Sequence, residues 1–310
     1  MSTSNRRLFC GAAALIVCGL LLLRQMAVPE AAGQRVLAAE RGLQWYRGNL
    51  HTHTLWSDGD AYPETVALWY KEHGYDFLCF TDHNTLLDRE RWIDALKNRG
   101  GQVALDRLRA EFPQGWIEER PGEDGRLEIR LKRFDEIVAR LAVPGEFLLI
   151  QGEEISDHFE KRPVHMNASN LTERIDPRGG DSVYEVMQRN TDALLAQRER
   201  TGRPMLIHLN HPNFGYAVTA EDLMRVRGEN FFEVYNGHPS VHNSGNSERA
   251  SSERIWDIIL TQRITELKLP LMYGLATDDG HAYHNIPSRG SEPGRGWIMV
   301  LAAELTPGAL

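Results

Sequence analysis

From about residue 40 onward, short apolar runs alternate with amphipathic stretches along the chain. Seven of the runs have the length and composition of β-strands: WYRGNLH, YDFLCFTD, FLLIQGEE, RPVHMNA, PMLIHLNH, FFEVYNG and LMYGLATDD. Strands that alternate with helical segments are typical of a mostly parallel sheet with helices outside it. With seven such units, the pattern favours a closed α/β barrel over an open sheet.

Several of the intervening helices have recognisable ends. Pro63 suits the first turn of one helix and Gly74 suits its C-terminal stop. Ser182, with Asp181 before it, can cap a second helix through VYEVMQRNTDALLAQRER, which Gly202 would end. The amphipathic stretch SERIWDIILTQRITEL predicts a third helix directly before the seventh strand.

One segment, residues 98–145, interrupts this alternation after the second strand. The sequences WIEER and RLEIRLK flank PGEDG, which predicts a hairpin, and the amphipathic stretch RFDEIVARLA predicts a helix after it. Two interpretations are open: a surface excursion, or a lid over the mouth of the barrel.

The two ends of the chain differ from the rest. Arg6 and Arg7 precede an uncharged apolar run, and a small-residue stretch follows, so residues 1–33 predict an export signal with a mature chain beginning near Gln34. The protein would then be periplasmic or secreted; the alternative is an N-terminal membrane anchor. At the other end, GWIMVLAAEL predicts a further strand and Thr306-Pro307 the start of a helix, so we expect the C-terminus to be incomplete or frayed.

The charge of the chain narrows the class of partner. The formal net charge is −8 over 310 residues, which gives no overall basic field for nucleic acid. We therefore expect a small-molecule substrate, no nucleic acid, and contact with membranes only if the N-terminal segment is retained. Cys79 would be the single cysteine of the mature chain, inside the apolar run FLCF, so no internal disulfide is expected.

Histidine and acidic residues gather where the predicted strands end. His51 and His53 stand two apart, so both side chains point to the same face of the first strand. Further groups of this kind are TDHN at 81–84, GEE at 152–154, His165, NHP at 210–212 and DDGH at 278–281. The active site of a parallel α/β barrel lies at the carboxyl ends of its strands, so these side chains are expected to meet at one rim.

In this order, HTH, SDG, TDHN, GEE, a lone histidine, NHP and DDGH resemble the motifs of the polymerase and histidinol phosphatase (PHP) family of metallohydrolases. The wider wording, with NHPNFG, FFEVYNGHP and GRGW, resembles its carbaryl-hydrolase-like (CehA/McbA) branch. The resemblance implies a distorted (β/α)7 barrel over residues 42–310, in which the hairpin and helix read from segment 98–145 would be an insertion after the second strand. It also implies two or three bound divalent metal ions.

Nine positions of the resemblance carry residues able to bind metal: His51, His53, Asp58, His83, Glu154, His165, His211, Asp279 and His281. Glu154 is preferred over Glu153 by the family spacing, and neighbours on a strand point to opposite faces. His208 and His211 are also expected to face opposite ways, which makes His208 a supporting or core residue. Asp82 and Asp278 can orient ligands by hydrogen bonds.

Nine nitrogen and oxygen ligands exceed the needs of one tetrahedral ion, and a bridging carboxylate is a usual means of holding two. We expect one ion on His51, His53, Glu154 and Asp279, and a second on Glu154, His165 and His211. A third would take Asp58, His83 and His281, the three residues we also expect to be catalytic, and Asp58 could instead accept a proton. Such ligands suit zinc, manganese or iron.

Three functions follow from this ligand set. The first is hydrolysis of an ester, carbamate or amide bond by metal-activated water, and neutral or aromatic residues at the rim favour it. The second is phosphoester hydrolysis, which would need basic residues such as Lys161, Arg162, Arg289 or Arg295. The third is a non-catalytic secreted module that binds metal or ligand. Residues proposed to contact the substrate are Asn84, Asn236, His238 and His284.

Overall fold

The structure is a computed structural model that describes residues 42–228 and 230–310. The chain divides into two compact units, Met1–Gln44 and Trp45–Leu310, and the second contains the site. The predicted export signal or anchor at residues 1–33 lies outside the described residues. Within the described part, no helix is long and apolar enough to cross a membrane.

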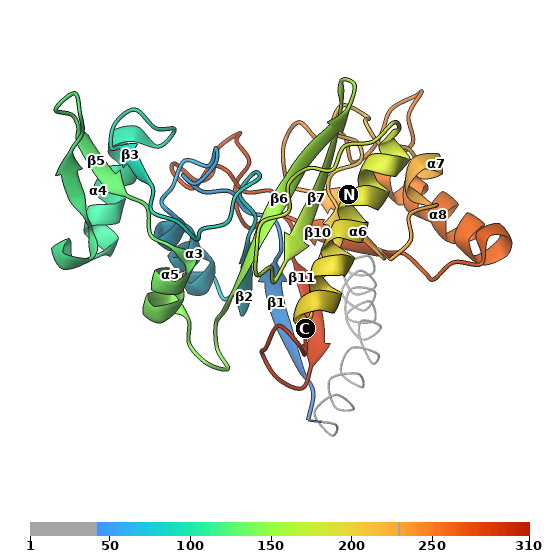
Figure 1. Cartoon of the computed structure of the whole chain (residues 1–310), viewed down its shortest axis with the longest axis horizontal. Helices are drawn as coiled ribbons and strands as arrows, with labels where there is room; N and C mark the ends of the chain where they lie inside the picture. The colour runs from blue at the N-terminus through green and yellow to red at the C-terminus, as the bar shows by residue number, and fades with distance from the viewer. Residues whose placement is uncertain (1–41, 229) are drawn as a thin grey trace, which may run out of the picture. The chain divides into compact units, whose positions relative to one another are not determined.

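Eight strands form one barrel-like sheet, which confirms the predicted fold (Figure 1). The order around the sheet is β10, β9, β8, β7, β6, β2, β1, β11, and the end strands β10 and β11 approach each other, so the sheet nearly closes. The strands are β1 (Gln44–Asn49), β2 (Phe77–Phe80), β6 (Leu148–Phe159), β7 (Arg162–Ser169), β8 (Leu206–Leu209), β9 (Phe231–Asn236), β10 (Tyr273–Thr277) and β11 (Ile298–Ala302).

One strand departs from the expected parallel arrangement. β7 runs antiparallel to both of its neighbours, β6 and β8, whereas β1, β2 and β6 pair in parallel, as do β8, β9 and β10. The reason is the connection: Phe159 pairs with Arg162, so only Glu160 and Lys161 separate the two strands. A two-residue turn can join only antiparallel strands, and Glu160 takes the positive φ of 54° that such turns favour.

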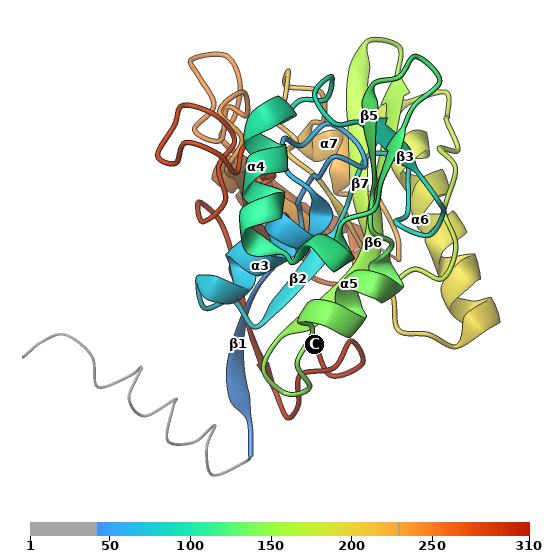
Figure 2. The same cartoon turned by 90° about the vertical axis from the view of Figure 1, so that its left-hand side faces the viewer.

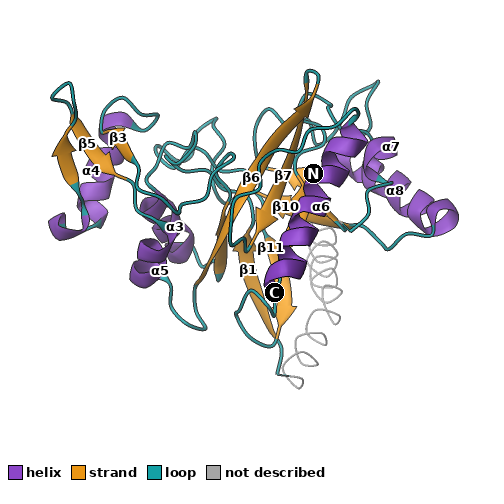
Figure 3. Ribbon diagram, viewed as in Figure 1, coloured by secondary structure: helices purple, strands orange, loops and turns teal. Residues whose placement is uncertain are grey.

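The helices cover the outside of the sheet (Figure 3). α6 (Val183–Thr201) packs on β6, β7 and β8, and α8 (Ser252–Gln262), which continues into a π-helical turn at Arg263–Leu267, packs on β9. Beside α8 lies the short α7 (Ala220–Leu223), and α3 (Pro63–Glu72) packs on β2. The predicted ends of α6 are present: the Ser182 hydroxyl accepts a hydrogen bond from the Glu185 amide, and Gly202 is left-handed.

The excursion, residues 92–141 between β2 and β6, forms its own small sheet and three helical segments (Figure 2). It contains β3 (Trp92–Asp94), α4 (Gly101–Glu111), η1 (Gln114–Trp116), β4 (Glu119–Pro121), β5 (Leu127–Arg130) and α5 (Phe134–Leu141). The hairpin β4–β5 and helix α5 agree with the predicted insertion. Helix α4 was not predicted because its N-cap residue, Gly100, has no side chain to mark the start, although Ala104, Leu105 and Leu108 form a buried stripe.

A buried polar contact joins the excursion to the barrel. The Glu64 side chain, at the start of α3, is 2% exposed and accepts a hydrogen bond of 3.0 Å from the Trp116 indole. Its other oxygen, Oε2, is buried without a hydrogen-bond partner among the described residues. Burial raises the pKa of Glu64 to about 7, although the Trp116 hydrogen bond opposes the shift. The amine of buried Lys132 lies 4.6 Å from the Trp116 ring.

Two further features concern the C-terminal strand and the residues after it. An apolar cavity of about 820 Å³ is bordered by Trp45, Phe77, Tyr273 and Trp297, and none of the nine predicted ligands borders it. The helix predicted at Thr306-Pro307 is not formed: these residues begin a turn in which Thr306 accepts two backbone hydrogen bonds.

The Glu64 environment predicts a pH-dependent stability. Because the pKa is raised above that of the unfolded chain, the contribution of Glu64 is full at low pH and is lost as the pH rises toward about 7. Glu64→Gln keeps the acceptor for Trp116 and removes the charge. We expect urea denaturation to show a gain of roughly 1–3 kcal/mol at pH 8 and little change near pH 5. Exposed Glu123→Gln is the control, and an equal gain at both pH values would contradict the prediction.

Candidate metal centre

The nine predicted ligands come together at one rim of the barrel, delivered by six strands. His51 and His53 follow β1, His83 follows β2, and Glu154 lies within β6. The others are Asp58 in the loop after β1, His165 in β7, His211 after β8, and Asp279 and His281 after β10. Four overlapping groups of these residues have ligand atoms within 4.8 Å of one another and could hold metal ions.

Glu154 is the centre of the cluster, and its two oxygens face different histidines. Oε1 lies 3.1 Å from His165 Nδ1, 3.3 Å from His211 Nε2 and 3.5 Å from His51 Nε2. Oε2 lies 2.7 Å from His83 Nδ1 and 3.3 Å from His53 Nε2. A carboxylate shared in this way between sets of histidines has the geometry of a ligand that bridges metal ions.

The inner set contains both histidines of the HTH motif. Their Nε2 atoms face each other at 3.2 Å, and Asp279 Oδ1 lies 3.3 Å from each. All three side chains are buried, so their charges are not screened by water. If both of these ring nitrogens carried protons, the two N–H groups would repel each other. A cation bound by both lone pairs would remove this repulsion.

The outer set opens toward solvent. Asp58 Oδ1 lies 3.2 Å from His281 Nε2, 3.5 Å from His83 Nε2 and 3.6 Å from His53 Nδ1. The Asp58 side chain is 50% exposed and that of His83 30% exposed. Asp58, His83 and His281, the three residues predicted to be catalytic, therefore lie together at the entrance, and His53 joins them.

The electrostatics of the cluster favour positive charge at its centre. Burial opposes ionisation of Glu154, yet His83, His165 and His51 lower its pKa well below the ordinary value. Burial likewise lowers the pKa of His83, but Glu154 and Asp58 outweigh it and raise that pKa to about 9. Burial and the neighbouring His281 and His83 lower the pKa of His53 to about 3. The donor set is entirely nitrogen and oxygen, which fits a divalent cation of the zinc, manganese or iron type.

Glu233, a residue that the sequence motifs did not identify, contacts two of the predicted ligands, His51 and His211. It is fully buried in β9, and its Oε1 lies 2.6 Å from His51 Nδ1 and accepts a hydrogen bond from Thr277. Its Oε2 accepts from the His211 amide at 2.8 Å and from Asn236. A carboxylate on the far nitrogen of a histidine fixes the tautomer and aims the other nitrogen at a metal. The sequence signal that could have identified Glu233 is the presence of an acidic residue inside the apolar run FFEVYNG.

Two of the predicted orienting acids also have partners that reach the ligands. Asp82 accepts hydrogen bonds from the Thr54 amide at 2.8 Å and the Ser57 hydroxyl at 2.6 Å, and Ser57 Oγ lies 3.3 Å from His53 Nδ1. Asp278 accepts from the Tyr70 hydroxyl at 2.7 Å and from Asn49. These contacts hold the loop after β1 in place.

The backbone at the rim is strained at three strand ends. Asn84, His211 and Asp279 have φ angles of 47°, 23° and 50°, in the region that side chains other than glycine rarely adopt. Strain of this kind persists where the surrounding structure holds it, and it is common at functional sites. The turns direct His211 and Asp279 inward from strands that have just ended.

The residues proposed to contact substrate differ in how many of their side-chain polar groups are already hydrogen-bonded within the protein. The Asn84 amide donates to the Ser156 carbonyl and accepts from the Ser156 amide, so both of its ends are occupied. Asn236 bonds Glu233, Asp279 and the His238 amide, and His284 Nε2 lies 3.0 Å from the Asp60 carbonyl. These contacts occupy polar groups of all three side chains, and their contact with substrate stays a prediction.

His238 differs from these three. Its Nδ1 accepts a hydrogen bond from the Ser240 amide, so the ring proton belongs on Nε2. Its ring lies 5.5 Å from the His281 ring and 6.2 Å from the Phe214 ring. It stays available to a substrate at the rim.

The remaining two expectations concern neighbours of the ligands. Glu153 faces away from the cluster and accepts a 2.5 Å hydrogen bond from the Ile175 amide, while burial raises its pKa to about 8. His208 is fully buried behind the cluster, with Nε2 3.5 Å from Glu233 Oε1. Both positions agree with strand alternation.

Comparisons with known proteins were made for both sequence and backbone. No family model and no curated protein matches the sequence. Similar solved structures include a two-domain Bacteroides vulgatus protein containing a predicted PHP-like metal-dependent phosphoesterase (TM-score 0.45, 16% identity, covering 85% of this chain and 60% of that one). The chain thus spans 60% of the length of that protein.

Two others span more of their own length. A Bifidobacterium adolescentis protein described as a candidate metal-dependent phosphoesterase has a TM-score of 0.41 and 14% identity, covering 80% of this chain and 91% of that one. A Chromobacterium violaceum amidohydrolase has a TM-score of 0.38 and 14% identity, covering 82% and 90%. These likenesses concern the course of the backbone only.

The central place of Glu154 predicts an unequal effect of two neighbouring substitutions. Glu154→Gln removes the charge that both oxygens share with five histidines, whereas Glu153→Gln changes a side chain on the opposite face. We expect elemental analysis to show that Glu154→Gln loses most of its bound metal and that Glu153→Gln keeps it. Equal losses would show that the wrong glutamate has been placed at the centre.

The Glu233 contact predicts a graded loss of metal affinity. Glu233→Gln keeps the size of the side chain but weakens the bond that orients His51, so we expect a drop of about 10–100-fold in a chelator competition assay. Exposed Glu221→Gln on α7 is the matched control. An unchanged affinity in a variant whose melting temperature is also unchanged would show that Glu233 serves packing alone.

Proposed function

We propose that this protein is a metal-dependent hydrolase of the PHP type, with two or three divalent ions, of zinc, manganese or iron, at the rim of its barrel. One observation carries the proposal: both oxygens of Glu154 are shared among five histidines that come from four different strands. A single structural ion needs only four ligands, and an ion-free module has no use for nine.

The roles of the residues follow from their positions. His51, His53, Glu154 and Asp279 would form the inner site, and His165 and His211 would complete a second site with Glu154. Asp58, His83 and His281 would form the outer site, where Asp58 can take a proton during turnover. When bound, such ions polarise the bond to be cleaved and make water acidic enough to attack it near neutral pH.

The walls of the entrance, rather than the cluster, select the bond. The cluster can direct attack on a carbonyl carbon or on phosphorus. An aromatic wall at Phe214 and His238, with ring centres 6.2 Å apart, suits the flat leaving group of an aryl ester or carbamate. A cationic group at the entrance would suit a phosphoester instead. In either case, we propose a small-molecule substrate.

The test is metal analysis joined to a substrate screen. Protein expressed with added zinc, manganese or iron is expected to carry about two or three ions per chain. Chelation should abolish hydrolysis of one or more of 4-nitrophenyl acetate, carbamate and phosphate, and metal addition should restore it. Glu153→Gln should be active and Glu154→Gln inactive. If protein expressed with added metal carries only one ion or none per chain, the multinuclear centre is ruled out.

A further inference from the structure

The excursion forms part of the entrance to the metal centre, because α4 and the turn before it contact two loops that carry ligands. Arg107 of α4 donates a 2.5 Å hydrogen bond to the Tyr283 carbonyl, and the Tyr283 amide donates to Asp60 at 2.8 Å. Gly100 lies so close to the Asp60 carbonyl that a Cβ atom would have no room. The excursion is thereby fixed beside Asp58 and His281.

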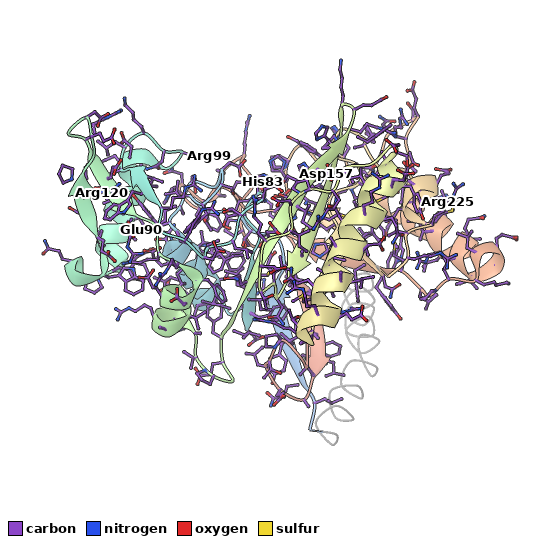
Figure 4. The ribbon with its side chains drawn as sticks, viewed as in Figure 1. His83, Glu90, Arg99, Arg120, Asp157 and Arg225 are labelled. Carbon is purple, nitrogen blue, oxygen red and sulfur yellow. The ribbon has the colours of Figure 1, made fainter. Side chains whose placement is uncertain are left out.

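Arg99 stands at the point of this contact. Its guanidinium donates to the Asp58 carbonyl, and its Nη1 lies 3.6 Å from Asp58 Oδ2. The other oxygen of the same carboxylate, Oδ1, lies 3.2 Å from His281 and 3.5 Å from His83. Asp58, itself a member of the outer set, therefore joins Arg99 to His83 and His281, and Figure 4 labels Arg99 and His83.

The loop that carries Arg99 is held by its own hydrogen bonds. The Asn98 side chain accepts from the amides of Gly100 and Gly101 at 2.9 and 2.8 Å and donates to the carbonyls of Asp94 and Ala95. These hydrogen bonds fix the backbone on both sides of Arg99, so the structure holds this residue at the entrance.

Most of the donors of Arg99 are free for a ligand. Among the described residues, Nε and Nη2 have no hydrogen-bond partner, and 52% of the side chain is exposed. Two of the arginines that the sequence offered for phosphate pair with acids that are not predicted ligands: Arg162 lies 3.9 Å from Asp222, and Arg295 lies 3.1 Å from Glu292. Arg99, by contrast, pairs with Asp58, which is a predicted ligand.

The charge of Arg99 is informative in this position. A guanidinium is always ionised and cannot bind a metal, so a site that holds divalent cations repels it unless anionic oxygens lie between. Asp58 supplies one such group. An anionic substrate oxygen would supply another, and the planar fork of arginine matches the oxygens of a phosphoryl group in two hydrogen bonds.

We propose that Arg99 is a specificity-determining residue that binds the phosphoryl oxygens of a phosphoester substrate at the metal centre. The inference rests on the proposed hydrolase function and adds the residue that would select a phosphoester among the substrates considered. The excursion then supplies the recognition group, and the barrel supplies the reacting centre.

The experiment compares variants of the metal-loaded protein on two substrates with one leaving group. Arg99→Gln should lower kcat/KM for 4-nitrophenyl phosphate by about tenfold or more and leave 4-nitrophenyl acetate nearly unchanged. Arg99→Lys should retain part of the phosphate activity because it keeps the charge but loses the fork. Arg120→Gln, also in the excursion but paired with Glu128, is the control and should match the parent (Figure 4).

Calorimetric binding of inorganic phosphate gives a readout without turnover. Phosphate binding that weakens in Arg99→Gln and not in Arg120→Gln supports the proposal, even if the parent hydrolyses neither ester, in which case the proposed function alone fails. Equal losses on both esters together with lost metal would show that Arg99 only positions Asp58 and would overturn the proposal. So would phosphate binding that is absent from the parent or unchanged in Arg99→Gln.

Discussion

The buried carboxylate of Glu154 is the interaction on which the site depends. Without a positive charge beside it, an ionised carboxylate with 1% side-chain exposure would be costly, and five histidine nitrogens lie between 2.7 and 3.5 Å from its oxygens. The histidines cannot all be protonated because they are also close to one another. The opposite shifts of two neighbours show this: the pKa of His83 is raised to about 9, and that of His53 is lowered to about 3. Bound cations would resolve the conflict that protons resolve only in part.

The cluster keeps its shape because buried acids outside it are satisfied by the protein itself. Glu233, Asp82 and Asp278 each accept several hydrogen bonds from backbone amides and side chains of neighbouring strand ends. Apart from the bond between Asn236 and Glu233 within β9, these bonds join segments that are distant in sequence, so displacing one ligand would break a bond in another segment. The barrel therefore presents its ligands in a fixed arrangement, and this preorganisation reduces what metal binding must order.

The parts of the site that the sequence predicted are those that local rules determine. Strand alternation places Glu154 inward and Glu153 outward, and the shared direction of the strands brings their ends to one rim. Glu233 was not predicted as part of the site because a single acidic residue in an apolar run forms no motif. The antiparallel direction of β7 was not predicted, because in the sequence a two-residue turn resembles the boundary between two strand–helix units. Arg99 could not be placed, since its contact with Asp58 joins residues 41 positions apart through a segment of unpredicted structure.

The contacts of the excursion bear on whether it acts as a fixed wall or as a lid. A lid must open by moving as a unit across an interface that costs little to separate. Opening here would break the bond between Arg107 and Tyr283 and expose the buried pair Glu64 and Trp116, whose carboxylate has few other partners. It would also draw Arg99 away from the entrance. These contacts favour a fixed wall that shapes the entrance permanently, so substrate selection would come from the chemistry of that wall and not from closure around the bound molecule.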